Sequence, residues 1–112
     1  MARAKSFTFA INGLYQLLRN EPNAVLHTIA TVAVVAAGIV RHIGPMQWVA
    51  IVIAIGLVWI TEAVNTGMER LCDHVCGNRF HPAIKLVKDV MAAAVMMAAG
   101  VSVVIGIIVF FF

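Results

Sequence analysis

Charged residues are scarce in this chain of 112 residues, and acidic ones are the scarcest. Only 12% of the residues are charged, with five Asp and Glu against eight Lys and Arg, whereas 62% are hydrophobic. Soluble globular domains are roughly 45–50% apolar. The composition therefore excludes an ordinary soluble domain and predicts an all-helical integral membrane protein, and the length predicts a single domain over residues 1–112.

Several sequence motifs are also missing. There is no G-x-x-x-x-G-K-[ST] loop and no Gly-rich loop followed by a strand with a lysine, so the soluble nucleotide-binding folds are excluded. No basic run is present, and the net charge of +3 indicates contact with anionic lipid, not nucleic acid. Cys72 and Cys76 lack the spacing of a zinc finger, and we interpret them as small buried residues.

Three apolar runs are long enough to cross a bilayer, at about residues 24–40, 46–64 and 90–112. A helix that spans a hydrocarbon core of about 30 Å needs about 20 residues, and the first run is near the short limit. Gly44-Pro45 predicts a turn between the first two runs. Trp48 and Trp59 are expected to anchor the second run at the membrane interfaces.

Residues 3–18 predict an amphipathic helix, because apolar side chains recur there at intervals of three and four: Phe7, Ile11, Leu14 and Leu18. We expect this N-terminal helix, residues 1–20, to lie on the membrane surface. The alternative is a helix that packs on the rest of the subunit. Asn20-Glu21-Pro22-Asn23 ends it, since proline is favoured in the first turn of the helix that follows.

The distribution of cations predicts the topology. With three spans, the N-terminus and the segment between the second and third spans lie on the same side of the membrane. That side holds all but one of the cations: Arg3, Lys5, Arg19, Arg70, Arg79, Lys85 and Lys88. The other side holds Arg41. The positive-inside rule therefore places the polar segment 65–89 at the cytoplasmic face, where nucleoside triphosphates are found.

Four of the five acidic residues lie at or just beyond the ends of the second and third runs: Glu62, Glu69, Asp73 and Asp89. On a helix, Glu62, Asn65, Glu69 and Asp73 fall within an arc of roughly 80°. Carboxylates at a membrane boundary are costly and usually functional.

This acidic face suits phosphate chemistry. Two carboxylates can hold Mg²⁺, Lys88 can supply a positive charge to phosphate, and Glu62 can take a proton from a lipid hydroxyl. A small oligomeric transporter or channel with Glu62 as its ion or proton site is an alternative. A non-catalytic assembly subunit is a third, although it would not need so many polar groups on one side.

The following residues resemble the prokaryotic diacylglycerol kinase family, which includes undecaprenol kinases: Glu62-Ala-Val-Asn65-Thr66-Gly-Met-Glu69-Arg-Leu-Cys-Asp73, then His81-Pro82, then Lys88-Asp89 with Ala92-Ala-Ala-Val. Upstream, Glu21, Asn23 and His27 are similar to the E-x-N-x-x-x-H pattern of its undecaprenol-kinase branch. The resemblance covers nearly the whole chain. It implies a homotrimeric lipid kinase in the bacterial inner membrane, with ATP and Mg²⁺ at sites between subunits on the cytoplasmic face.

The resemblance also implies a role for individual residues. Glu62 corresponds to the proton acceptor, and Glu21 and Glu69 correspond to the metal ligands. The residues expected at the nucleotide are Phe9, Glu21, Glu69, Arg79, Phe80, His81, Lys88 and Asp89. Asn23, Asn65 and Asp73 are expected to line the same site. Because of Asn23 and His27, undecaprenol is favoured over diacylglycerol as the lipid alcohol.

Overall fold

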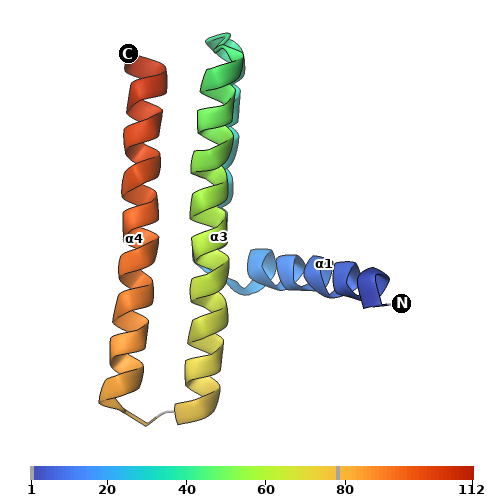
Figure 1. Cartoon of the computed structure of the whole chain (residues 1–112), viewed down its shortest axis with the longest axis vertical. Coiled ribbons are helices and arrows are strands. Elements are labelled where there is room, and N and C mark those ends of the chain that lie inside the picture. The colour runs from blue at the N-terminus through green and yellow to red at the C-terminus, as the bar shows by residue number, and fades with distance from the viewer. Residues whose placement is uncertain (1, 78) are drawn as a thin grey trace.

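The prediction of an all-helical fold is confirmed. The structure, a computed structural model, describes residues 2–77 and 79–112, and these residues form four helices. They are α1 (Ala2–Asn20), α2 (Asn23–Val40), α3 (Pro45–Cys76) and α4 (Pro82–Phe111), shown in Figure 1. Pro45 and Pro82 each stand in the first turn of a helix, where a missing N–H is tolerated. Gly77, at φ 61°, follows the end of α3. Gly77-Asn78 in the sequence predicts a helix stop, and Asn78 lies outside the described residues.

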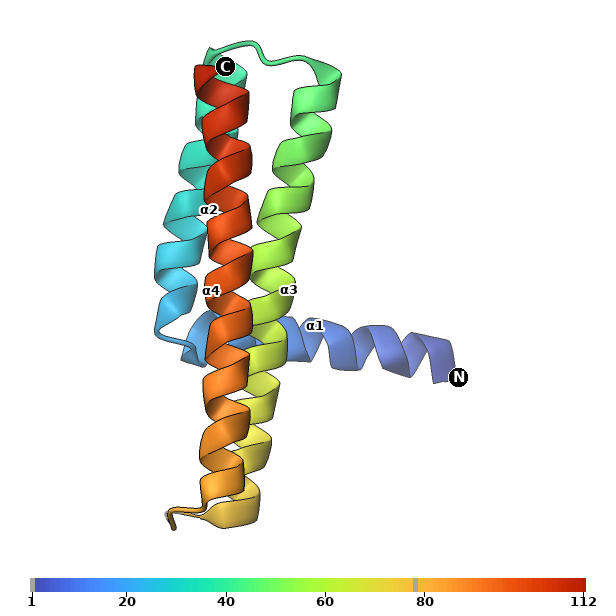
Figure 2. The same ribbon diagram turned by 60° about the vertical axis from the view of Figure 1, so that its left-hand side comes forward.

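The three long helices run alongside one another, and α1 crosses their direction. α3 and α4 form an antiparallel hairpin along their whole length (Figure 1). α2 lies beside them and joins α3 at the end opposite the α3–α4 turn (Figure 2). In both views the hairpin extends well past α1. The elbow between α1 and α2 therefore meets α3 part of the way along its length.

α2, α3 and α4 are long and apolar enough to cross a membrane. α2 has 18 residues and α3 has 32, which at about 1.5 Å per residue gives lengths of roughly 27 Å and 48 Å. A hydrocarbon core is about 30 Å thick. α2 is thus matched to the core, whereas α3 and α4 have length to spare. The apolar runs of the sequence are only parts of these two helices, whose remaining turns carry the polar segment 65–89.

Small side chains let α3 and α4 pack closely. Ala54 on α3 and Ala98 on α4 are both buried. The Ser102 hydroxyl donates a hydrogen bond of 3.0 Å to the carbonyl of Ala54. Small residues and hydroxyl groups are typical of helix contacts in membranes, because the hydrophobic effect does not drive association between helices there. These contacts hold the hairpin on which most of the acidic residues lie.

The end of α4 is fastened to the turn between α2 and α3. Arg41 donates a hydrogen bond of 2.9 Å to the carbonyl of Phe110, and Gln47 donates one of 3.2 Å to the carbonyl of Val109. Carbonyl groups in the last turn of a helix have no partner within the helix. Arg41, the lone cation predicted on this side of the membrane, therefore also acts as a cap for α4.

The contact between α2 and α3 near this turn depends on Gly38. A Cβ atom at this position would lie 2.7 Å from Cη2 of Trp48 and 3.0 Å from Cδ1 of Ile43. We expect Gly38→Ala to lower the free energy of unfolding by about 1–3 kcal/mol, the usual effect of overpacking. Thermal unfolding of the purified protein in detergent would measure it. Gly100→Ala is the matched control, because its Cβ would meet nothing within 4 Å. Equal midpoints for the two variants would contradict this account of the turn.

Most apolar side chains of the single chain are exposed. In the most apolar stretches of α2, α3 and α4, only 11%, 17% and 11% of the residues are buried within the chain. Contiguous apolar surface of this extent marks contact with membrane or with other chains. The exposed surface therefore fits a membrane-embedded protein. The homotrimer and the surface position of α1 stay predictions.

Candidate active site

Glu62 is the most deeply buried charged residue that the structure describes, with 1% of its surface exposed. It lies on α3 and faces α2, where its Oε2 atom is 3.2 Å from Nε2 of His27. Its other oxygen, Oε1, is buried and has no hydrogen-bond partner among the described residues. A buried carboxylate oxygen without a partner is costly, and it marks a place where a ligand can supply the missing donor.

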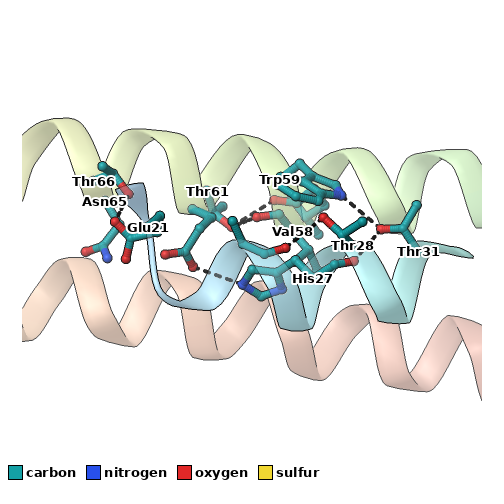
Figure 3. A network of polar contacts seen from close by, with 12 residues as sticks. Glu21, His27, Thr28, Thr31, Val58, Trp59, Thr61, Asn65 and Thr66 are labelled. Carbon is teal, nitrogen blue, oxygen red and sulfur yellow. Dashed lines mark hydrogen bonds and ion pairs between the residues drawn. The ribbon is translucent and has the colours of Figure 1, made fainter. Parts of the chain in front are cut away.

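His27 is itself held in place by α2 and α3. The hydroxyl of Thr31, one turn further along α2, donates a hydrogen bond of 2.7 Å to the carbonyl of His27. The indole N–H of Trp59 on α3 donates one of 2.9 Å to the same hydroxyl. The rings of His27 and Trp59 meet edge to face, with centroids 5.8 Å apart. Figure 3 shows these side chains converging between the two helices.

The next turn of α3 carries a second buried polar side chain, Asn65. Its amide nitrogen donates a hydrogen bond of 3.3 Å to Oε1 of Glu69. Its amide oxygen is buried and unpartnered among the described residues, like one oxygen of Glu62. The predicted face of α3 thus contains two adjacent turns that each present a free, buried oxygen.

Glu21 reaches this face from the elbow between α1 and α2. Its Oε2 atom accepts a hydrogen bond of 3.1 Å from the hydroxyl of Thr66. Thr66 lies between Glu62 and Glu69 on α3, and Figure 3 shows Glu21, Asn65 and Thr66 close together. Leu17 and Ala24, which flank Glu21, are buried and fix the elbow against the bundle. The structure therefore brings Glu21 beside the acidic face of α3, although it is distant in sequence.

Two ion pairs mark the outer end of the site. Nζ of Lys88 lies 2.7 Å from Oδ1 of Asp73 and links α4 to α3. Nζ of Lys85 lies 2.6 Å from Oδ2 of Asp89, one turn along α4. All four side chains are well exposed, so the pairs are available to rearrange around a ligand. Asp73 is one turn beyond Glu69 on α3. Its partner Lys88 therefore lies about one helical turn from Glu69, one of the two predicted metal ligands.

The remaining predicted site residues are not drawn into these contacts. Phe9 is exposed on α1, Asn23 is exposed at the start of α2, and Arg79 and Phe80 are exposed before α4. Among the residues that the structure describes, no hydrogen bond or ion pair joins their side chains to the acidic face. His81 precedes α4 and accepts a hydrogen bond of 3.2 Å from the N–H of Ala83. In the single chain its ring therefore serves as a helix cap.

The donor set fits a hard cation, although its groups are not gathered into a closed cage. Within the two described ranges, no three His, Cys, Asp or Glu residues lie close enough to hold a metal ion. Mg²⁺ in nucleotide sites is usually held by one or two carboxylates, and phosphate and water complete its shell. Glu21 and Glu69 supply carboxylates, while Asn65 supplies a free amide oxygen beside them. These oxygen donors are of the type that Mg²⁺ requires.

A groove of about 470 Å³ separates α1 from α3. Small residues from both helices line much of it, among them Ala10, Gly13, Ala63 and Gly67. Thr66, the partner of Glu21, and Arg70 also border the groove. Its α3 lining belongs to the face of that helix next to the acidic one, and Thr66 lies where the two faces meet.

Sequence reasoning missed several partners in the site. His27 was singled out as a polar residue at membrane depth and in the branch pattern, but its partner Glu62 was not foreseen. Thr66 was noted only as part of the kinase motif, and Trp59 only as an interfacial aromatic. The signal that pointed to His27 was its position: a titratable residue within a membrane span suggests a functional site. No comparable signal pointed to the Thr31–Trp59 hydrogen bond, because either residue is unremarkable alone.

The fold and the site define a small membrane protein built from helices, with a buried carboxylate below a cluster of acidic and basic groups. Comparison with known proteins places it more narrowly. The family model described as prokaryotic diacylglycerol kinase matches residues 8–110. The chain therefore belongs to the prokaryotic diacylglycerol kinase family, as its motifs indicated, and this is a family of lipid kinases.

Two relatives agree with this assignment. The chain is 33% identical over 106 residues to a Bacillus subtilis protein named undecaprenol kinase, and the match covers 95% of this chain and 85% of the relative. It is 32% identical over 101 residues to a Synechocystis protein named diacylglycerol kinase, with 90% of this chain and 58% of the relative covered. No solved structure is significantly similar to the chain. Neither relative is named as a transporter or channel, so that alternative gains no support.

Proposed function

We propose that the protein transfers the γ-phosphoryl group of ATP to the hydroxyl of a membrane lipid alcohol, with Mg²⁺, at the cytoplasmic face of the bacterial inner membrane. The observation that carries the proposal is the state of Glu62. This carboxylate is buried, one of its oxygens is held by His27, and the other has no partner. Such a group is suited to accept a proton from a hydroxyl that arrives from the bilayer.

In the proposed reaction, Glu62 accepts the proton of the lipid hydroxyl and later releases it. As the lipid oxygen attacks the γ-phosphorus, Oε1 of Glu62 takes the hydroxyl proton. An oxygen–phosphorus bond forms to the lipid, and the bond to the β-phosphate oxygen breaks, which releases ADP. The proton then leaves Glu62 for solvent before the next turnover. General-base assistance of this kind typically contributes about 10²- to 10⁴-fold in rate.

The residues one to two turns outward from Glu62 would hold the charged end of the nucleotide. Glu21 and Glu69 would hold the metal ion, and Asn65 would supply a neutral oxygen beside them. Bound Mg²⁺ neutralises negative charge on the phosphates. Phosphoryl transfer is mostly positioning and charge neutralisation, so Lys88 would assist as a point charge once it exchanges Asp73 for phosphate.

The outermost predicted residues would bind the rest of the nucleotide. These residues are Phe9, Arg79, Phe80, His81 and Asp89, with Asn23 and Asp73 nearer the phosphates. Their exposure in the single chain supports a site completed by a neighbouring subunit, as expected for a homotrimer. A nucleotide would otherwise contact only one side of an open helical hairpin.

The depth of the groups also supports the proposal. If α2 spans the hydrocarbon core, its first residue, Asn23, lies at one interface, and the adjacent contact between Glu21 and Thr66 lies there too. Glu62 is then about one turn inside, and Glu69 and Asp73 are outside. The lipid hydroxyl would approach along the groove between α1 and α3, where α1 shelters it from water.

The resemblance of Asn23 and His27 to the pattern of the undecaprenol-kinase branch favours undecaprenol over diacylglycerol as the acceptor, while the two relatives bear one name each. The test is ADP release by the purified protein in mixed micelles that contain undecaprenol, diacylglycerol or no lipid alcohol. We expect release to depend on lipid, with the higher kcat/KM for undecaprenol. A higher kcat/KM for diacylglycerol would reverse the choice of acceptor. ADP release that no lipid alcohol accelerates would contradict the proposed function.

A further inference from the structure

We infer that His27 is a positioning residue that fixes the orientation of the Glu62 carboxylate, so that Oε2 is held and Oε1 is presented to the lipid hydroxyl. This inference rests on the proposed role of Glu62 as the base and adds the group that aims it. His27 lies on α2 and Glu62 on α3. The contact between them therefore also ties the orientation of the base to the packing of two membrane helices.

The two oxygens of Glu62 are chemically equivalent, and the protein makes them different. The terminal torsion of a Glu side chain has a broad, two-fold profile, so an unrestrained carboxylate rotates easily. Here Oε2 lies 3.2 Å from Nε2 of His27, whereas Oε1 has no partner among the described residues. An ionised carboxylate can only accept hydrogen bonds. Glu62 must be ionised to act as the proposed base, and in that state Nε2 of His27 carries the hydrogen and donates it to Oε2.

His27 can restrain Glu62 only because it is restrained itself. Its backbone carbonyl accepts from Thr31, whose hydroxyl in turn accepts from the indole of Trp59. The Trp59 ring also contacts the imidazole edge to face, with an interplanar angle of 62°. Trp59 lies three residues before Glu62 on α3. The network thus closes a loop from α3 through α2 and back to α3, visible in Figure 3.

The test compares His27→Gln with His27→Met. Glutamine keeps an N–H donor near the position of Nε2, and methionine fills a similar volume without a donor. We expect His27→Met to lower kcat by about 10- to 100-fold, the range for a lost hydrogen bond to a charged group and a misplaced reactive group. We expect KM for ATP to change little, because the side-chain contacts of His27 are with Glu62 and Trp59 and not with the groups proposed to hold the nucleotide. His27→Gln should recover most of kcat.

Thr28→Ala is the matched control. Thr28 is the next residue on α2, and its hydroxyl donates to the carbonyl of Ala24 in the same helix. This variant should keep the kcat of the wild-type protein. Trp59→Phe is a second probe, since it keeps a ring but removes the donor to Thr31. It should lower kcat with KM for ATP unchanged, and to a smaller extent than His27→Met.

Equal losses of kcat in His27→Gln and His27→Met would overturn the inference, because the donor would then not matter. Wild-type kcat in His27→Met would overturn it as well, and so would a loss that appears in KM for ATP alone. The proposed function fails on different evidence, namely a wild-type protein that transfers no phosphoryl group to lipid. A wild-type protein that phosphorylates lipid, together with a fully active His27→Met variant, would refute only the role of His27.

Discussion

Glu62→Gln is expected to reduce phosphoryl transfer to lipid by about 10²- to 10⁴-fold, the contribution of general-base catalysis, while ATP binding persists. Glutamine keeps the shape of the side chain but cannot accept the hydroxyl proton. The buried site offers no close replacement, because among the described residues Glu62 is the one buried carboxylate. His27 already contacts the other oxygen of Glu62. Loss of the base should therefore appear in kcat and not in nucleotide affinity.

Two measurements are needed for this prediction: lipid-dependent ADP release, and the dissociation constant of ATP from equilibrium titration in the same micelles. Thr61→Val is the matched control, since Thr61 is adjacent to Glu62 and its hydroxyl donates to the carbonyls of Leu57 and Val58 in its own helix. This control should turn over normally. Near wild-type turnover in Glu62→Gln would show that another group takes the proton. A loss of ATP binding equal to the loss of turnover would show that Glu62 acts in nucleotide binding instead.

Glu21→Gln and Glu69→Gln are expected to raise the Mg²⁺ concentration required for half-maximal activity by at least about 10- to 100-fold, the loss seen even for outer-shell partners of a metal. The carboxylate charge is removed, while the amide oxygen of a glutamine at position 21 can still accept from Thr66. The elbow between α1 and α2 should therefore keep its place. The effect should be largest at low Mg²⁺ and shrink as the ion approaches saturation.

A Mg²⁺ titration of kcat/KM for ATP at fixed lipid checks this second prediction. His74→Gln is a suitable control, because His74 is an exposed residue of the same helix that belongs to none of the proposed ligand sets. It should leave the Mg²⁺ dependence unchanged. An unchanged half-maximal Mg²⁺ concentration in both Glu variants would contradict the metal assignment. If the half-maximal Mg²⁺ concentration changed in only one variant, the metal ion would be held by that one carboxylate of the protein.

Much of the helical arrangement follows from local features of the sequence. Hydropathy marks the three long helices, and Pro45, Pro82 and Gly77 mark ends of α3 and α4 for reasons of backbone chemistry alone. Hydropathy alone does not give the length of α3, whereas Gly77-Asn78 predicts where this helix stops. The apolar run of the second span stops near residue 64, yet α3 continues to Cys76. Helical hydrogen bonds do not require apolar side chains, so a helix can leave the membrane without ending.

Some residues of the candidate site could be predicted from local sequence patterns, and others depend on how the helices pack. The acidic face of α3 could be predicted because helical periodicity places Glu62, Asn65 and Glu69 together. That Glu21 joins this face could be expected only from the family resemblance, since it depends on how the elbow packs on α3, and its contact with Thr66 was not predicted. The contact between His27 and Glu62 joins residues 35 positions apart, and no local pattern encodes it. Phe9, Arg79 and Phe80 are exposed in the single chain, and their role at the nucleotide stays a prediction that goes with the proposed homotrimer.

The most direct test of the account is the fate of the terminal phosphoryl group. Purified protein would be incubated with ATP labelled at the γ-phosphorus, Mg²⁺ and either undecaprenol or diacylglycerol in mixed micelles, and label would be measured in the organic extract. The account predicts label on the lipid phosphate in at least one incubation, and none with Glu62→Gln above background. Label that remains in ATP or inorganic phosphate with both lipids would contradict the claim that this protein is a lipid kinase.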